Sequence, residues 1–101
     1  MEWMGVDTER VVGEVEKAFS SPGKLKILQL LMKNPDHTFT RYEIRNKIPL
    51  NSTDIKRNLT VLVEANWVKE IHLQHLQKYS INLDNELVTQ FINLFKKIKY
   101  V

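Results

Sequence analysis

The apolar residues of this chain recur at every third or fourth position over most of its length. This spacing is typical of amphipathic helices, whose apolar stripe faces a core. It predicts five helices, at residues 8–19, 22–33, 41–48, 51–65 and 84–99. The helix at 22–33 is apolar nearly all round, so we expect it at the centre of the molecule.

The pattern changes between the fourth and fifth predicted helices. In residues 67–73 and 77–83, apolar and polar side chains alternate, which predicts two strands. Only the short polar segment 74–76 separates them, so they are expected to form a β-hairpin. The fold class is therefore mainly α with a small β-hairpin.

Polar residues that cap helices precede several of these segments. Ser21 stands before a proline suited to the first turn of a helix, and Asn51 and Asp84 are placed to cap the helices that follow them. Thr40 and Glu43 have the spacing of a capping box, in which each side chain binds a free backbone amide of the other.

The length of 101 residues fits one domain, and no linker divides it. We expect a core at residues 21–83, with a helix added at each end (8–19 and 84–99). The absence of cysteine excludes disulfides and thiolate metal sites. No apolar run is long enough to span a membrane, and residues 1–20 carry five acidic side chains, unlike a signal peptide. We therefore expect a cytoplasmic protein.

The net charge of +3 is unevenly distributed. Residues 21–50 hold six basic and two acidic side chains, whereas residues 1–20 hold two basic and five acidic ones. The basic excess thus lies within the predicted core. This distribution excludes a disordered basic arm and is compatible with a structured basic face.

No arrangement of residues suggests catalysis or a metal centre. The chain lacks a glycine-rich phosphate loop and a plausible nucleophile–base set. His72 and His75 are close together, but His37 is remote, and a metal site needs three or four converging ligands. We expect no enzymatic activity, no cofactor and no metal.

Two short helices joined by a tight turn and followed by a hairpin form a winged helix-turn-helix. In this arrangement the second helix, here 51–65, can lie in the major groove of DNA. The hairpin reaches a neighbouring groove or phosphate. The polar side chains of helix 51–65 lie on the face opposite its apolar stripe. They include cations, an amide and hydroxyls, which can form hydrogen bonds with the edges of DNA bases.

The residues that carry the pattern also resemble a known family. The stretch Lys26–Asn85 is similar to winged-helix transcription regulators of the ArsR type, in their small archaeal and bacterial versions. The resemblance rests on four runs: Lys26-Ile27-Leu28-Gln29-Leu30-Leu31, Phe39-Thr40-Arg41-Tyr42-Glu43-Ile44, Leu50-Asn51-Ser52-Thr53-Asp54-Ile55-Lys56-Arg57-Asn58-Leu59 and Leu62-Val63-Glu64-Ala65-Asn66-Trp67-Val68. It implies a DNA-binding transcription regulator, in which Arg57 falls on the family's arginine of the recognition helix.

The chain departs from the family pattern at three places. Pro49 stands where the turn usually has glycine. Asp54 puts an anion near the expected DNA face. Near its turn, the hairpin carries Lys78 as a cation, with His72 and His75 beside it.

We assign the expected DNA contacts to three segments. They are Arg41 and Tyr42 in helix 41–48; Ser52, Thr53, Lys56, Arg57 and Asn58 in helix 51–65; and Lys78 in the hairpin. The alternative is that these side chains form an ordinary solvated surface, and that Tyr42 is partly buried. Arg45 and Lys47 can be plain surface charges.

The end helices suggest a second interface. The apolar face of helix 84–99 is wide enough for two contacts, one with its own core and one with another subunit. The candidate dimer residues are Val11, Val15, Phe19, Leu87, Phe91, Leu94, Phe95 and Ile98. The alternative is a single thick core contact.

These features favour a homodimeric repressor that reads a pseudo-palindromic DNA site. Two alternatives stay open: a winged-helix module that binds a protein, and an architectural or partition protein that coats DNA with little sequence preference. The salt dependence of DNA binding separates the two DNA readings.

Overall fold

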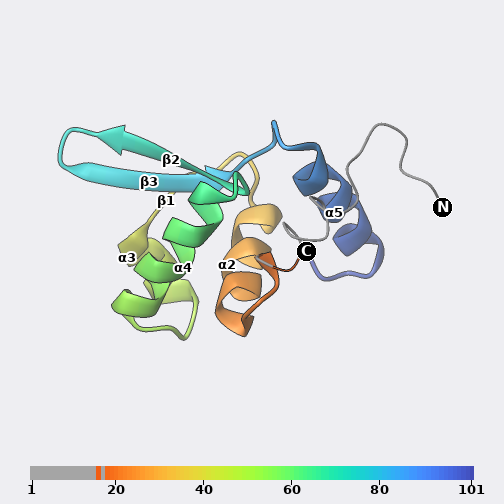
Figure 1. Ribbon diagram of the computed structural model, residues 1–101, viewed down its shortest axis with the longest axis horizontal. Coiled ribbons are helices and arrows are strands. Elements are labelled where there is room, and N and C mark those ends of the chain that lie inside the picture. The colour runs from red at the N-terminus through yellow and green to blue at the C-terminus, as the bar shows by residue number, and fades with distance from the viewer. Residues whose placement is uncertain (1–15, 17) are drawn as a thin grey trace.

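The computed structural model describes residues 16 and 18–101. Its labelled elements run in the order α2 (Pro22–Lys33), β1 (Phe39–Thr40), α3 (Arg41–Lys47), α4 (Ser52–Glu64), β2 (Val68–Leu73), β3 (Leu76–Ile81) and α5 (Glu86–Lys97) (Figure 1). Most of the helix expected at 8–19, with Val11 and Val15, lies outside the described residues.

Local capping explains where α2, α3 and α4 begin. The Ser21 side chain accepts a hydrogen bond from the Lys24 amide, and Pro22 is the first helical residue. Thr40 and Glu43 form the expected capping box, with distances of 3.1 Å from Glu43 N to Thr40 Oγ1 and 2.9 Å from Thr40 N to Glu43 Oε1. All three predicted starts are confirmed, since Asn51 caps α4 in the same way.

The end of α4 is a Schellman motif. Asn66 has a φ of 64°, and its amide donates to Val63 O. The amide of Trp67 donates to Leu62 O. These two bonds satisfy carbonyls that the helix leaves free and turn the chain into β2.

The sheet has three antiparallel strands in the order β1-β3-β2. Phe39 pairs with Tyr79, which joins β1 to the hairpin. The sequence pattern did not predict β1, because a two-residue strand exists only through this pairing. The hairpin turn is also tighter than expected: Leu73 pairs with Leu76, so the turn consists of two residues and not three.

The predicted start of the last helix was wrong. Asn85, and not Asp84, is the N-cap of α5, and the helix begins at Glu86. The reason lies in the preceding turn, where the Asn82 side chain accepts a hydrogen bond from the Asp84 amide. This bond draws Asp84 into the turn, and its carboxylate pairs with Lys69 on the surface.

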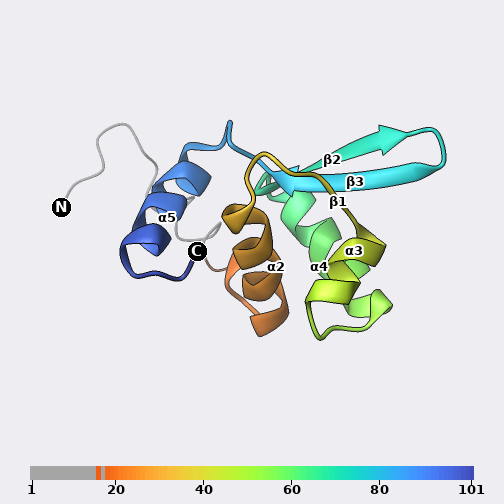
Figure 2. The ribbon, with the colours of Figure 1, turned by 180° about the vertical axis from the view of Figure 1, so that it is seen from behind.

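The core lies between the helices and one face of the sheet. The helix α2 occupies the centre as expected, between α5 on one side and the α3–α4 pair on the other (Figures 1 and 2). Its residues Ile27, Leu28 and Leu31 are almost fully buried. The hairpin runs along one side of the helices and projects beyond α3 and α4 at the end far from α5.

Candidate nucleic-acid interface

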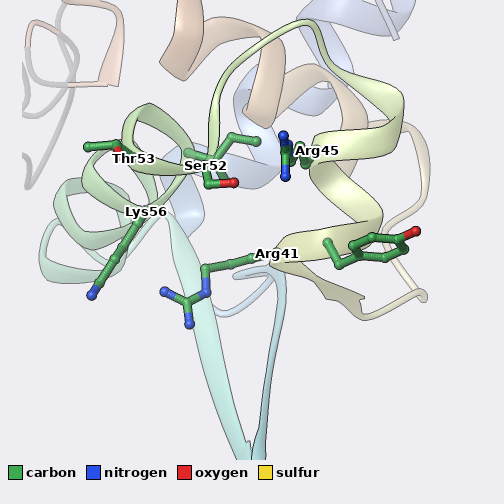
Figure 3. A pocket seen from close by; sticks show the side chains of 7 residues that line it. Arg41, Arg45, Ser52, Thr53 and Lys56 are labelled. Atoms are coloured by element: carbon green, nitrogen blue, oxygen red, sulfur yellow. The ribbon is translucent and has the colours of Figure 1, made fainter.

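A groove of about 410 Å³ lies between α3 and α4. Its lining consists of Arg41, Tyr42, Arg45, Ser52, Thr53, Ile55 and Lys56. Figure 3 shows the charged ends of Arg41 and Lys56 at one end of the groove, with Arg45 and Ser52 further along it. The sequence predicted five of these seven residues as DNA contacts.

The caps described above fix the position of these side chains. Arg41 is the first residue of α3, directly after the capping box, and Arg45 follows one turn later on the same face. Ser52 and Thr53 open α4, and Lys56 follows one turn later. Both helices thus present their N-terminal turns to the groove.

The charge of the groove is positive. Three of its lining residues are cations, Arg41, Arg45 and Lys56, and none is acidic. Such a surface attracts phosphate, and its hydroxyl groups can donate to or accept from a nucleic acid.

Tyr42 is 71% exposed, which excludes the alternative that it belongs to the core. It is one of the residues that line the groove, next to Arg41 in the chain. A phenol in this position offers both an apolar face and a hydroxyl to a bound partner.

Arg57 lies outside the groove, on the exposed face of α4. It forms an ion pair with Asp54, one turn earlier in the same helix. The aspartate that departs from the family pattern therefore has a local role: it accepts a hydrogen bond from Arg57 and holds this side chain against the helix.

Asn58 does not belong to the exposed face, and its prediction as a DNA contact was wrong. It is only 7% exposed. Its side chain packs on α2, where Gly23 leaves room: a Cβ at that position would lie 2.6 Å from Asn58 Nδ2. Because Gly23 of α2 has no side chain, Asn58 can pack against α2 and is buried. The sequence of α4 alone does not contain this information.

Lys78 is partly buried and does not line the groove. It pairs with Thr40 and Ile71 across the sheet and lies near Glu43. The Thr40 amide holds the pKa of Glu43 below its ordinary value, and the charge of Lys78 adds to this effect. The structure therefore gives Lys78 a place beside the capping box.

The dimer candidates within the described residues divide into two sets. Leu87 is buried, and Phe19, Phe91 and Phe95 pack around the buried Trp67 or one another, with ring centroids 5.2 to 6.1 Å apart. These four contribute to the chain's own core. The remaining two, Leu94 and Ile98, are 48% and 63% exposed and form the outer edge of α5.

Solved structures with the same architecture come from several bacteria. HlyU from Vibrio cholerae superposes with a TM-score of 0.76 at 19% identity, covering 94% of this chain and 97% of that one. The transcriptional repressor BigR from Xylella fastidiosa gives 0.73 at 20% identity, with 89% and 87% covered. A homodimeric winged helix-turn-helix DNA-binding domain from Mycobacterium bovis, a possible ArsR-family regulator, gives 0.69 at 22% identity, with 96% and 90% covered.

The fold is a winged helix-turn-helix. In this fold, α3 and α4 are the two helices of the helix-turn-helix, and the β2–β3 hairpin is the wing. No protein-family model matches the chain, and no curated protein matches it significantly. The predicted fold class is confirmed.

Sequence reasoning underrated three residues of this surface. Arg45 lines the groove, and its spacing of four from Arg41 on one helix is the signal in the sequence that points to this position. His72 and His75 lie beside Arg41 across a second hollow, at the wing. Their position depends on the pairing of β3 with β1, which no local pattern encodes.

Two further observations bear on the described residues. They contain no group of three potential metal ligands. Among them, no helix has both the length and the apolar character needed to cross a membrane.

Proposed function

We propose that this protein is a DNA-binding transcription regulator that acts as a homodimer, most simply as a repressor that occupies a promoter. The α3–α4 groove is the observation that carries the proposal, because it joins three cations to two helix N-termini with no acidic residue in its lining. The structural neighbours support it, since they include a transcriptional repressor and a homodimeric DNA-binding domain. This function places the protein with the nucleoid, in the cytoplasm.

The dimensions of α4 suit the major groove of B-DNA. A helix with its side chains is about 10–12 Å across, and the groove is about 12 Å wide. In our proposal, Ser52, Thr53 and Lys56 enter this groove from the first turns of α4. Arg57 exchanges its ion pair with Asp54 for a phosphate or a guanine edge.

In the proposed complex, helix α3 contacts the DNA backbone while α4 lies in the major groove. Arg41 and Arg45 each present a guanidinium, whose planar donors match phosphate oxygens. Tyr42 supplies a hydroxyl beside them. These contacts set the position of the protein on the duplex and leave the reading of sequence to α4.

In a dimer, each of the two subunits contacts one half-site of the DNA. The outer edge of α5, with Leu94 and Ile98, offers apolar surface that the described part of the chain leaves exposed. Pairing of this edge with a second copy buries it, and a two-fold dimer presents two copies of α4 to a pseudo-palindromic site. A binding role of this kind needs no catalytic residues.

The test is a fluorescence-anisotropy titration of a duplex enriched from a random-sequence pool. Lys56→Ala is compared with Lys33→Ala, which removes the same charge from an exposed position at the end of α2. We expect Lys56→Ala to weaken binding and to reduce the slope of log K against log salt by about 0.9. Lys33→Ala should bind as the wild type does. Equal losses in both variants would contradict a specific role for the groove.

A further inference from the structure

A second hollow, of about 670 Å³, separates the start of α3 from the wing. Its lining consists of Thr40, Arg41, Tyr42, His72, Gln74, His75, Leu76 and Gln77. Arg41 and Tyr42 also line the α3–α4 groove, so the two hollows adjoin at the start of α3. The wing projects beyond the helices on this side of the molecule (Figures 1 and 2).

The wing side of this surface has no permanent cation. Arg41, from α3, is the only lysine or arginine that lines the second hollow. Lys78 of the wing does not line this hollow. The remaining basic groups of the lining are the imidazoles of His72 and His75, both exposed.

The charged groups that face these imidazoles come from the wing and from α3. Glu70, two residues before His72, places Oε1 2.9 Å from His72 Nε2. Its other oxygen accepts a hydrogen bond of 2.9 Å from the Tyr79 hydroxyl. Burial, followed by this bond, raises the pKa of Tyr79 to about 12, so Tyr79 keeps its proton and remains the donor of this bond. Arg41 faces the same cluster from α3.

With neutral imidazoles, the wing side of the hollow offers a phosphate only neutral donors, such as the amides of Gln74 and Gln77, and the nearby carboxylate of Glu70 repels it. A proton on His72 offsets that carboxylate at hydrogen-bond distance, and a proton on His75 adds a positive charge at the turn. Histidine is the side chain that changes charge between about pH 5 and pH 8. A nearby phosphate favours the protonated form, so protonation and phosphate binding reinforce each other.

We propose that the wing holds a DNA phosphate through protonated His72 and His75, so that DNA binding takes up protons and strengthens as the pH falls. This inference rests on the proposed function and adds a regulation to the same surface. The protein then binds DNA more tightly when the pH of the cytoplasm is mildly acidic than when it is neutral.

The test measures the Kd of the enriched duplex at pH 7.5 and pH 6.0 for three proteins: the wild type, the double variant His72→Gln/His75→Gln, and His37→Gln as control. His37 packs its ring on Phe39 and lines neither hollow. Gln keeps a polar side chain without a titratable proton. A circular-dichroism melt at both pH values verifies that each variant is folded.

We expect the wild type and His37→Gln to bind about tenfold more tightly at pH 6.0 than at pH 7.5. Their salt slopes should steepen by about one to two at the lower pH, as extra phosphates are neutralised. The double variant should lose both effects and still bind at pH 7.5. Wild-type binding that is independent of pH, or an unchanged pH effect in the double variant, would overturn the inference alone. Failure of the wild type to bind at either pH would overturn the proposed function as well.

Discussion

At the scale of single residues, the capping box at the start of α3 joins stability to the position of Arg41. Thr40 and Glu43 satisfy each other's backbone amides, and Arg41 is the residue that follows Thr40. Removal of either side chain frees an amide of the first turn. The cap therefore orients the cation that both hollows share.

The same box gives stability a dependence on acid. The pKa of Glu43 is lowered in the folded state, mainly by the amide of Thr40. A depressed carboxyl pKa contributes stability above the unfolded pKa, and this contribution is lost as the pH falls through the folded value. We expect Glu43→Gln, which keeps the hydrogen-bond acceptor, to flatten the decrease of the melting temperature below about pH 4.5.

Thr40→Ala should act differently, because it removes a cap at every pH. We expect it to lower the free energy of unfolding by about 1 kcal/mol at neutral pH. Thermal melts of Glu43→Gln from neutral to acidic pH and urea titrations of Thr40→Ala at neutral pH, each beside the wild type, measure these effects. An acid response of Glu43→Gln identical to that of the wild type would contradict the assigned role of the carboxylate.

A variant at Asn58 distinguishes a role in packing from a role in DNA contact. Because its amide packs on Gly23 beneath the surface, we expect Asn58→Ala to lower the free energy of unfolding by about 1 kcal/mol. Its affinity for DNA should stay within about twofold of the wild type, whereas Arg41→Ala should weaken binding and leave stability within about 0.5 kcal/mol. The reverse outcome, a stable Asn58→Ala variant that binds poorly, would return this residue to the interface.

At the scale of elements, the helices were predictable and the small sheet was only partly so. Capping residues act within one turn, so Ser21, Thr40 and Asn51 could be recognised in the sequence. Strand β1 depends on Tyr79, forty positions away from Phe39, and was missed. The start of α5 was misplaced because an equally good cap, Asn85, stands beside Asp84.

This neighbouring pair provides a direct test of the corrected start of α5. We expect Asn85→Ala to lower the free energy of unfolding by about 1 kcal/mol, since it removes the acceptor of the Leu87 amide. Asp84→Ala removes only an exposed ion pair with Lys69 and should cost less than about 0.5 kcal/mol. Thermal melts of the two variants compare them, and a larger loss in Asp84→Ala would restore the original prediction.

At the scale of the whole molecule, α5 connects the core to the proposed dimer. Its inner face could be predicted from the sequence as apolar, but not its division between core and outer edge. That division follows from the cluster of Phe19, Trp67, Phe91 and Phe95, which occupies the inner face. Leu94 and Ile98 are left outside it.

The proposed dimer can be tested at this outer edge. We expect Ile98→Glu to shift the sedimentation-equilibrium mass from two chains to one, because a carboxylate there must be buried on pairing. Leu73→Glu, at a similarly exposed position on the wing, should leave the mass at two chains. A wild-type protein that sediments as one chain at micromolar concentration would contradict the homodimer.

The reading of a DNA sequence is the central claim, and its most direct test compares two duplexes. One is enriched from a random pool by this protein, and the other has the same composition in shuffled order; both are titrated at 50 mM and 200 mM salt. We predict that the enriched duplex binds at least about a thousandfold more tightly and keeps this preference at the higher salt. Equal binding that disappears with salt would indicate a protein that coats DNA, and no binding to either duplex would favour a winged helix that recognises another protein.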